Sequence, residues 1–267
     1  MTNSSPPLAQ TTAIETLSLL LKALRLPYIH QQWQELERQA LQQGWTHAQF
    51  LLAACEHEAT QRYQTRVERA LKDAQLPPAK VFSNFDFARC STFNPAQVMQ
   101  LAQDKAWLKR GDNLLLFGPS GVGKTHLAGA IGRALVELGA RVRFLSATTL
   151  VQLLQASKAN LQLQPALLKL DKYDLLILDD LSYVKKSEAE TSVLFELIAH
   201  RYELKSLMIT ANHPFSAWDN IFTDSIMTVA AVDRLVHHAV ILEIQAESFR
   251  QQTAKQRSFS DDPKRSK

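Results

Sequence analysis

Apolar residues recur along the first third of the chain at the spacing of an amphipathic helix. From about residue 14 to residue 76 they follow one another every three or four positions, without strand-like alternation. The repeating positions include Leu17, Leu20, Leu21, Leu24, Phe50, Leu51, Ala54, Val67 and Leu71. Gly44 and residues 26–27 (Leu-Pro) break the pattern, and residues 76–78 (Leu-Pro-Pro) end it. The sequence therefore predicts three or four helices followed by a short linker.

A different pattern begins near residue 80, where short apolar runs rich in β-forming residues alternate with helical stretches. The runs cover residues 113–117, 142–145, 173–178, 207–210 and 240–244. Strands separated by helices are typical of a parallel sheet that is covered on both faces. The sequence thus predicts the α/β class, with a five-stranded parallel sheet between helices and a small all-helical domain in front of it.

These patterns divide the chain into three parts. Residues 1–79 form the predicted helical N-terminal domain, in which about 12 polar residues at the start are expected to be disordered. Residues 80–250 form the predicted α/β domain. Residues 251–267 carry more basic than acidic side chains, and we expect them to be a disordered basic tail.

Composition limits the class of protein. With 46% hydrophobic and 21% charged residues, the 267-residue chain resembles a soluble globular protein. No apolar run reaches the roughly 18 residues that cross a bilayer, and the N-terminus lacks signal-peptide features, so we expect a cytoplasmic protein with no membrane partner. Cys55 and Cys90 lack metal-ligand spacing and are expected to be inert thiols. The net charge of +4 favours a polyanionic partner only mildly.

The most specific motif follows the first apolar run. It is the octapeptide Gly118-Pro119-Ser120-Gly121-Val122-Gly123-Lys124-Thr125, which fits G-x-x-x-x-G-K-[ST] at every fixed position. A helical pattern over residues 125–138 comes next, and Gly139 is expected to end it. The order of strand, glycine loop and helix distinguishes a P-loop from a chance glycine turn. A dinucleotide fingerprint is excluded, because it would require glycine at His126.

Each residue type in this motif suits phosphate binding. The glycines let the backbone turn tightly and direct its N–H groups at phosphate oxygens, and the start of the following helix favours an anion. Lys124 is expected to place its charge on the β and γ phosphates, while the Thr125 hydroxyl ligates Mg²⁺. The sequence thus predicts a site for ATP and Mg²⁺ in which residues 118–126 contact the nucleotide.

Two further strand ends carry polar side chains that suit ATP hydrolysis. The third apolar run is followed by Asp179, which would hold Mg²⁺ through its water shell, and by Asp180, which would polarise the attacking water as a general base. A solvated turn is the alternative for this pair. After the fourth run, an amide at Asn212 could hydrogen-bond the γ-phosphate or the water, with Thr210 as second choice, although Asn-His-Pro is also typical of a turn.

Five segments together resemble the IstB family, the ATP-binding helper proteins of insertion-sequence transposition. The segments are residues 121–128 (GVGKTHLA), 174–181 (DLLILDDL), 209–212 (ITAN), 233–239 (DRLVHHA) and 247–250 (ESFR). The resemblance covers residues 80–250, and residues 21–27 (LKALRLP) also resemble the family's N-terminal region. The family belongs to the AAA+ ATPases and is related to the DnaC helicase loader and the DnaA initiator.

The resemblance implies an AAA+ fold in a homo-oligomer that assembles on duplex DNA, with ATP between subunits and a cognate transposase as partner. An arginine from a neighbouring subunit would complete the site. Arg234 matches this arginine best, and an ion pair with Asp233 or Glu203 is the alternative reading of its position. Arg201 is the second candidate, and Arg250 is the candidate sensor 2 residue.

The resemblance also assigns Asn212 to the sensor 1 position, and it has two departures. Most AAA+ proteins carry glutamate where this chain has Asp180. Because aspartate is one methylene shorter, we expect the attacking water to be held less well and hydrolysis to be slow. The chain ends soon after its last predicted strand, so we expect no helical lid domain.

Basic residues of the helical region suggest where DNA binds. Arg62, Arg66 and Arg69 share one helix face, which could lie along phosphates without reading sequence. A solvated face paired with Glu58 and Glu68 is the alternative. Further candidates are Lys22, Arg25, Arg38, Lys72, Arg133, Arg141, Arg143, Lys185 and Lys186.

Together these features predict a DNA-binding AAA+ ATPase that helps a transposase to select its target, with turnover that is slow or stimulated by DNA. A helicase loader that binds a replicative helicase is the first alternative. A small-molecule kinase also uses a P-loop, but Asp179, Asp180 and Asn212 suit water activation better than transfer to an acceptor.

Overall fold

The computed structural model describes residues 8–90, 92–181, 187–214, 218 and 225–245. The chain divides into two compact units, Met1–Arg69 and Ala70–Lys267. The boundary therefore precedes the one expected between residues 79 and 80. The reason is that Ala70, Leu71 and Ala74 at the end of a long helix pack into the core of the second unit.

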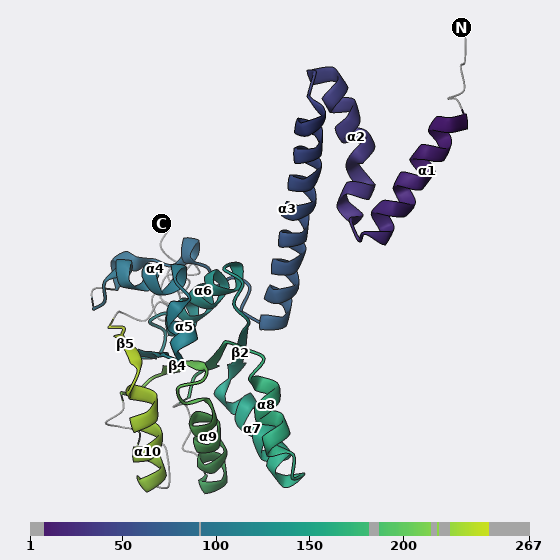
Figure 1. The fold of residues 1–267 in the computed structure, drawn as a ribbon. Helices are drawn as coiled ribbons and strands as arrows, with labels where there is room; N and C mark the ends of the chain where they lie inside the picture. Colours follow the sequence, from purple (N-terminus) through teal and green to yellow (C-terminus); the bar gives the residue numbers. More distant parts are fainter. Residues whose placement is uncertain (1–7, 91, 182–186, 215–217, 219–224, 246–267) are drawn as a thin grey trace, which may run out of the picture. The chain divides into compact units, whose positions relative to one another are not determined.

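Three helices form the described part of the first unit (Figure 1). They are α1 (Leu8–Ala23), α2 (Pro27–Gln43) and α3 (His47–Ala74), the last of which continues into the second unit. Residues 1–7 lie outside the described residues. α1 begins at Leu8, within the stretch of about 12 residues that was expected to be disordered, and leucine, alanine and glutamine there are good helix formers.

The connection between α2 and its neighbours follows the sequence signals. Pro27 begins α2, and Gly44 ends it with a left-handed φ of 64°. Glu58 of α3 is buried, and its Oε2 accepts hydrogen bonds from the N–H groups of Tyr28 and Ile29 at 2.9 and 2.8 Å. A carboxylate at a helix start satisfies free N–H groups and suits the helix dipole, so Glu58 ties α2 to α3.

The second unit contains the predicted five-stranded parallel sheet. Its strands are β1 (Asn113–Phe117), β2 (Val142–Ser146), β3 (Leu175–Asp179), β4 (Ser206–Ala211) and β5 (Ala239–Glu243). They lie in the order β2-β3-β4-β1-β5, and all pairs are parallel. Every strand coincides with one of the five apolar runs, so the predicted fold class is confirmed.

Helices cover both faces of this sheet. They are η1 (Phe82–Asn84), η2 (Phe87–Arg89), α4 (Pro95–Gln103), α5 (Ala106–Arg110), α6 (Lys124–Glu137), α7 (Ala147–Ala159), α8 (Leu163–Leu170), α9 (Glu188–Arg201) and α10 (Ser225–Val236). Figure 1 shows α4, α5 and α6 on one face and α7 to α10 on the other. Neighbouring residues of β1 face opposite layers: Leu114 shares a core with Leu127 of α6, and Leu115 shares one with Leu150 of α7.

The segment expected to be a linker is packed against this unit. Leu76 is partly buried in the same core as Leu127, and the N–H of Lys80 donates to the carbonyl of Pro77 at 3.1 Å. Cys90 lies in this core as well, and burial, followed by the charge of Asp86, raises the pKa of its thiol. A protonated buried thiol is a poor nucleophile. No helix in the described part of the chain is long and apolar enough to cross a membrane.

Candidate functional site

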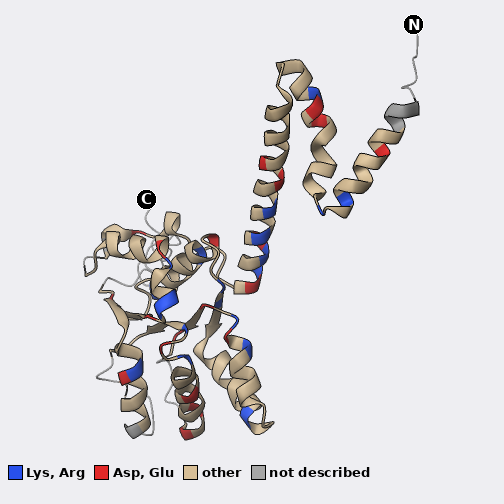
Figure 2. Ribbon diagram, viewed as in Figure 1, with Lys and Arg blue, Asp and Glu red and all other residues tan. Residues whose placement is uncertain are grey.

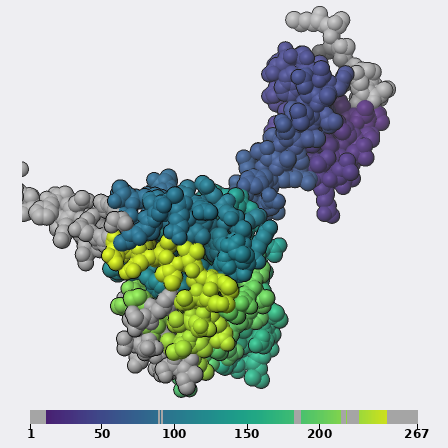
Figure 3. Space-filling view, turned by 60° about the vertical axis from the view of Figure 1, so that its left-hand side comes forward, coloured from purple at the N-terminus to yellow at the C-terminus, as the bar shows by residue number. Residues whose placement is uncertain are grey.

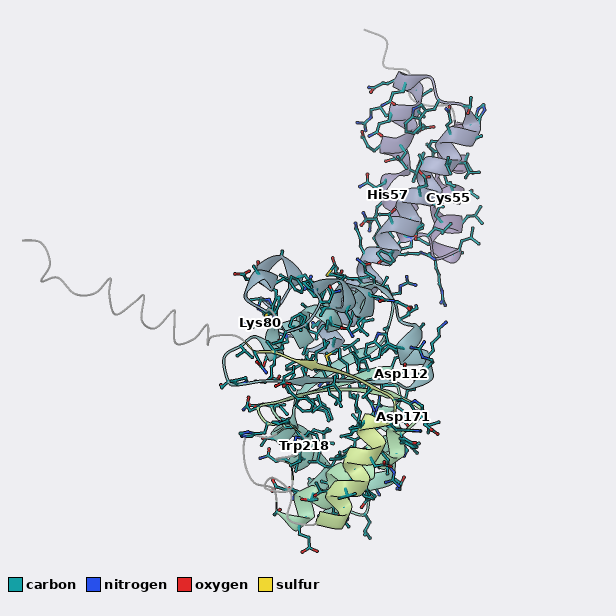
Figure 4. All side chains as sticks on the ribbon, turned by 90° about the vertical axis from the view of Figure 1, so that its left-hand side faces the viewer. Cys55, His57, Lys80, Asp112, Asp171 and Trp218 are labelled. Carbon is teal, nitrogen blue, oxygen red and sulfur yellow. The ribbon has the colours of Figure 1, made fainter. Side chains whose placement is uncertain are left out.

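Three strand ends bring the predicted site residues to one edge of the sheet. β4 lies between β1 and β3. The P-loop follows β1, Asp179 ends β3 with Asp180 directly after it, and Asn212 follows β4. Parallel strands deliver their carboxyl ends to a common crevice. In Figure 4, Trp218, which follows β4, lies at this carboxyl edge, whereas Asp112, which precedes β1, lies at the opposite, amino edge. The site residues are therefore neighbours although they are far apart in sequence.

The P-loop has a backbone conformation that favours glycine. Gly118 and Gly123 have φ angles of 148° and 104°. A Cβ atom at Gly118 would lie 2.2 Å from the carbonyl oxygen of Ile244, and one at Gly123 would lie 3.0 Å from the Phe85 ring. Directly after Gly123, α6 begins at Lys124, so its first free N–H groups belong to the loop. This arrangement suits a phosphate group.

Lys124 folds back into the loop. Its side chain is buried, and Nζ donates to the carbonyl oxygens of Gly118 at 2.7 Å and Pro119 at 2.8 Å. A third hydrogen bond, of 2.7 Å, runs to Oδ1 of Asn212. The lysine and the amide, which the sequence assigned to one site from separate segments, are thus in direct contact.

Thr125 and Asp179 form the oxygen-rich part of the site. The Thr125 hydroxyl donates to Oδ1 of Asp179 at 2.9 Å and lies 3.1 Å from Oδ2. A hydroxyl and a carboxylate at this distance are hard oxygen donors of the kind that Mg²⁺ prefers. These two residues therefore fit the divalent ion that the sequence predicts here.

Thr210 and Asn212 of the β4 end hold the second carboxylate. The backbone N–H of Asp180 donates to Oγ1 of Thr210 at 2.8 Å, and Nδ2 of Asn212 donates to Oδ1 of Asp180 at 3.3 Å. Asp180 has a left-handed φ of 65°, which is uncommon for residues with a side chain. Its position after β3 is therefore fixed through both its backbone and its carboxylate.

An aromatic segment before β1 lies against the P-loop, and the sequence analysis did not single it out. The ring of Phe85 packs edge-on against His126, with centroids 5.3 Å apart. His126 Nε2 is also 2.8 Å from the carbonyl oxygen of Val81. The signal that could have located this segment is the recurrence of phenylalanine at positions 82, 85 and 87 just upstream of the first strand.

The structure contradicts the choice of Arg201 as second candidate for the arginine that acts on a neighbouring subunit. Arg201 is 1% exposed, and its guanidinium donates to the carbonyls of Leu170, Tyr173 and Ser206 at 3.2, 3.1 and 3.1 Å. Burial lowers the pKa of Arg201 to about 10, although nearby aspartates, including Asp171 at 3.6 Å, act in the opposite direction. A guanidinium held inside its own subunit cannot project into another one, so Arg201 is a structural residue.

Arg234 lies in the last turn of α10, far from its own P-loop. The next residue, Leu235, accepts a hydrogen bond of 3.1 Å from the side chain of Asn113, which begins β1. The P-loop follows the other end of that strand, about 16 Å away at 3.3 Å per residue. The segment of α10 and β5, yellow in Figure 3, lies at the surface of the second unit. Arg234 therefore cannot reach the nucleotide site of its own subunit.

The alternative ion pairs of Arg234 do not form within the described part of the chain. Its guanidinium donates to the carbonyl of Ala230 at 2.9 Å and lies 5.3 Å from the centre of the Phe195 ring. Neither Asp233 nor Glu203 pairs with it among the described residues. Arg250, Lys185 and Lys186 lie outside the described residues.

Basic side chains gather on the second half of α3 (Figure 2). Arg62 is held by an ion pair of 2.6 Å with Glu58 and donates to the carbonyl of Arg25. Arg66 lies over the Tyr63 ring at 5.4 Å, and its side chain is exposed, as is that of Arg69. The predicted basic face thus separates into one arginine that stabilises the helix pair and two that face solvent.

The other basic candidates have mixed surroundings. Arg38 pairs with Glu35 at 2.7 Å, and Arg133 pairs with Glu137 at 3.2 Å. Arg143 donates to the carbonyl of Asp73 at 2.6 Å, a contact that fixes the end of α3 within the second unit.

Comparison with known proteins gives relatives that are named as insertion sequence ATP-binding proteins. A protein of Sinorhizobium fredii named as an insertion sequence ATP-binding protein is 54% identical over 238 residues, which cover 89% of this chain and 80% of that protein. The corresponding IS21 protein of Pseudomonas aeruginosa is 35% identical, covering 88% of each chain.

Solved structures show the same fold. DnaA from Aquifex aeolicus, bound to AMPPCP, matches with a TM-score of 0.53 at 19% identity, over 71% of this chain and 57% of that one. The DnaC helicase loader matches with a TM-score of 0.50 at 22% identity, over 58% of this chain and 95% of that one. Both are AAA+ P-loop ATPases, and at these identities the likeness concerns the fold alone. Residues 19–257 match the family described as IstB-like ATP binding protein, and the chain belongs to that family.

Proposed function

We propose that this chain is an AAA+ ATPase that assembles on duplex DNA in its ATP-bound form and assists the transposase of an insertion sequence in selecting a target. The observation that carries the proposal is the hydrogen-bonded group of Lys124, Thr125, Asp179, Asp180 and Asn212 at the carboxyl edge of the sheet. This group has a cation for phosphates, oxygen ligands for a metal and a carboxylate for water. The names of the relatives supply the biological setting.

Each of these side chains has a defined task in ATP hydrolysis. Lys124 exchanges its carbonyl and Asn212 partners for the β and γ phosphates, which are better partners for an ammonium group. Thr125 would bind Mg²⁺ directly and Asp179 would hold it through its water shell, and the ion would neutralise charge on the phosphate oxygens. Asp180 accepts a proton from the attacking water, and Asn212, released by Lys124, orients the water or the γ-phosphate.

The arginine of the catalytic site comes from a second copy of the chain. Arg234 lies at the amino edge, too far from its own P-loop, and α10 lies at the surface. An arginine of this kind stabilises negative charge on the transferring phosphoryl group and accelerates hydrolysis by roughly 10³-fold or more. This assignment requires a homo-oligomer with ATP between subunits.

Mixing two inactive variants tests the arginine assignment. Asp180→Asn removes the base but leaves Arg234 in place, whereas Arg234→Ala keeps an intact P-loop and base. If the arginine acts on a neighbour, a mixture of the two will regain turnover that neither has alone. A mixture with no more activity than its components would refute action between subunits.

The helicase-loader alternative has weaker support. The DnaC likeness concerns the fold, at 22% identity and over 58% of the chain, whereas four insertion-sequence proteins match 85% or more of it at 30–54% identity. For DNA contact, we propose the exposed Arg66 and Arg69 on α3. Such contacts are with phosphates and carry no sequence information.

The proposal is tested by ATP turnover with and without duplex DNA. We expect slow turnover by the chain alone, faster turnover on DNA, and loss of both in Asp180→Asn with ATP affinity retained. Turnover by Asp180→Asn at the parent rate would refute the assignment of the base. Absence of turnover under every condition would refute the ATPase function itself.

A further inference from the structure

We propose that Thr210 is a positioning residue of the ATP site, whose buried hydroxyl fixes both the Asp179 carboxylate and the Asp180 backbone in the arrangement that hydrolysis needs. The inference deepens the proposed ATPase function and rests on it. From sequence, Thr210 was only the second choice for a contact with phosphate or water. The structure gives its hydroxyl different partners.

The Thr210 side chain connects two strands at the site. Thr210 is 1% exposed and lies in the buried strand β4. Oγ1 donates to Oδ1 of Asp179 at 2.7 Å and accepts from the backbone N–H of Asp180 at 2.8 Å. One residue of β4 therefore binds both residues that carry the proposed metal and water chemistry at the end of β3.

The direction of these hydrogen bonds is fixed by chemistry. The carboxylate of Asp179 can only accept a hydrogen bond, and the backbone N–H of Asp180 can only donate one. The single hydroxyl proton of Thr210 must therefore point at Asp179, and an oxygen lone pair must face Asp180. Threonine is also stiff at χ1, because it is branched at Cβ, so the hydroxyl is held in this direction.

The contact with Asp179 orients the carboxylate that is proposed to hold Mg²⁺ through its water shell. Oδ1 of Asp179 accepts from Thr210 at 2.7 Å and from Thr125 at 2.9 Å. With Mg²⁺ bound, Thr125 would turn its oxygen to the ion, and the hydrogen bond from Thr210 would remain to orient the carboxylate. Partners of this kind, which hold a ligand from behind, typically affect metal affinity or activity by about 10- to 100-fold.

The contact with Asp180 maintains an uncommon backbone conformation. Asp180 has a φ of 65°, and the carbonyl of Thr210 additionally accepts from the N–H of Leu181 at 3.0 Å. Both N–H groups of this turn are thus bound by one threonine. Without the hydroxyl, the Asp180 N–H loses its partner, and the turn that aims the base is less strongly held.

Two matched pairs of variants separate the hydroxyl from the packing of the side chain. Threonine and Thr210→Val have the same shape and differ in the hydroxyl. Thr210→Ser and Thr210→Ala both lack the methyl group and again differ in the hydroxyl. The second pair preserves the comparison if valine prevents folding, which circular dichroism will reveal.

Two readouts are measured on the full-length chain. The first is kcat, which we expect to fall by about 10- to 100-fold when the hydroxyl is absent and to change by less than about 3-fold in Thr210→Ser. The second needs no turnover: it is the Mg²⁺ concentration that half-maximally enhances binding of a non-hydrolysable ATP analogue. This midpoint should rise by about 10-fold in the variants without the hydroxyl, while analogue affinity without Mg²⁺ stays within about 3-fold of the parent.

The outcomes distinguish this proposal from the function on which it rests. If the parent hydrolyses ATP and the valine or alanine variant matches its partner in kcat and in the Mg²⁺ midpoint, Thr210 has no positioning role. Equal losses in Thr210→Ser and Thr210→Ala would assign the effect to packing and also overturn the proposal. If the parent itself has no turnover, the ATPase function fails, and the Mg²⁺ titration alone decides the role of Thr210.

Discussion

Replacement of Arg201 by methionine separates a structural arginine from a catalytic one. The change removes three charged hydrogen bonds to the carbonyls of Leu170, Tyr173 and Ser206 and the attraction to Asp171 at 3.6 Å. Breaking a buried charged network by removing one partner costs about 3–5 kcal/mol. Because the other oxygen of Asp171, Oδ2, keeps its contact with His200 Nε2 at 2.8 Å, the carboxylate is not left without a partner, and we expect a loss near the lower end, about 3 kcal/mol.

Urea unfolding of the nucleotide-free chain, followed by circular dichroism, measures this loss. In a thermal scan the same change corresponds to a decrease in Tm of about 6–12 °C for a unit of this size. Arg234→Met is the matched control. Within the described part of the chain, its guanidinium donates one hydrogen bond, to Ala230, and contacts the Phe195 ring, so we expect a loss of about 1 kcal/mol or less.

The two substitutions should therefore affect different properties of the protein. Arg201→Met should be destabilised, whereas Arg234→Met should fold normally and lose ATP turnover. An Arg201→Met chain that unfolds like the parent but no longer turns over ATP would refute the structural role and return Arg201 to the catalytic candidates.

Three further predictions concern the nucleotide and DNA sites. Lys124→Ala should reduce ATP affinity by at least about 100-fold in a titration with a fluorescent nucleotide, because the ammonium group that binds the β and γ phosphates is lost. Affinity within a few-fold of the parent would contradict the assignment. Gly118→Ala should lower the free energy of unfolding in urea by about 2–4 kcal/mol, because the added Cβ would lie 2.2 Å from the Ile244 carbonyl oxygen and the φ of this position is 148°. An unchanged unfolding midpoint would show that the loop adapts. Replacing Arg66 and Arg69 together by alanine should reduce the slope of log DNA affinity against log salt concentration by about 2. Arg38→Ala should leave this slope unchanged, because Arg38 pairs with Glu35 at 2.7 Å. Equal slopes in the parent, the double variant and Arg38→Ala would place the DNA contacts elsewhere.

Local chemistry explains which parts of this protein could be predicted from its sequence. The strands were predictable because each is an apolar run, and β1, β3 and β4 are buried along most or all of their length. The phosphate loop was predictable because its glycines are required by a backbone that closely approaches Ile244 and Phe85. Asp179 and Asn212 were predictable as strand ends, since parallel topology brings such ends together.

The remaining features depend on contacts between distant segments. Sequence alone did not show that Arg201 is buried, because an arginine in a helix is usually exposed and its carbonyl partners come from the connections around β3 and β4. It did not show that the Thr210 hydroxyl binds the Asp179 carboxylate and the Asp180 backbone, because the direction of a hydroxyl is set by its neighbours. The unit boundary was also displaced, since helical periodicity continues through residues 70–74 while their packing partners change.

The central claim is that ATP bound around Lys124 controls binding to duplex DNA. The most direct test is fluorescence anisotropy of labelled duplex DNA with ATP, with ADP and without nucleotide, across a salt series, on the parent chain and on Lys124→Ala. We expect cooperative, salt-sensitive binding by the parent that requires ATP and is lost in Lys124→Ala. Binding of equal strength in every nucleotide state and in both proteins, or no binding in any state, would contradict it.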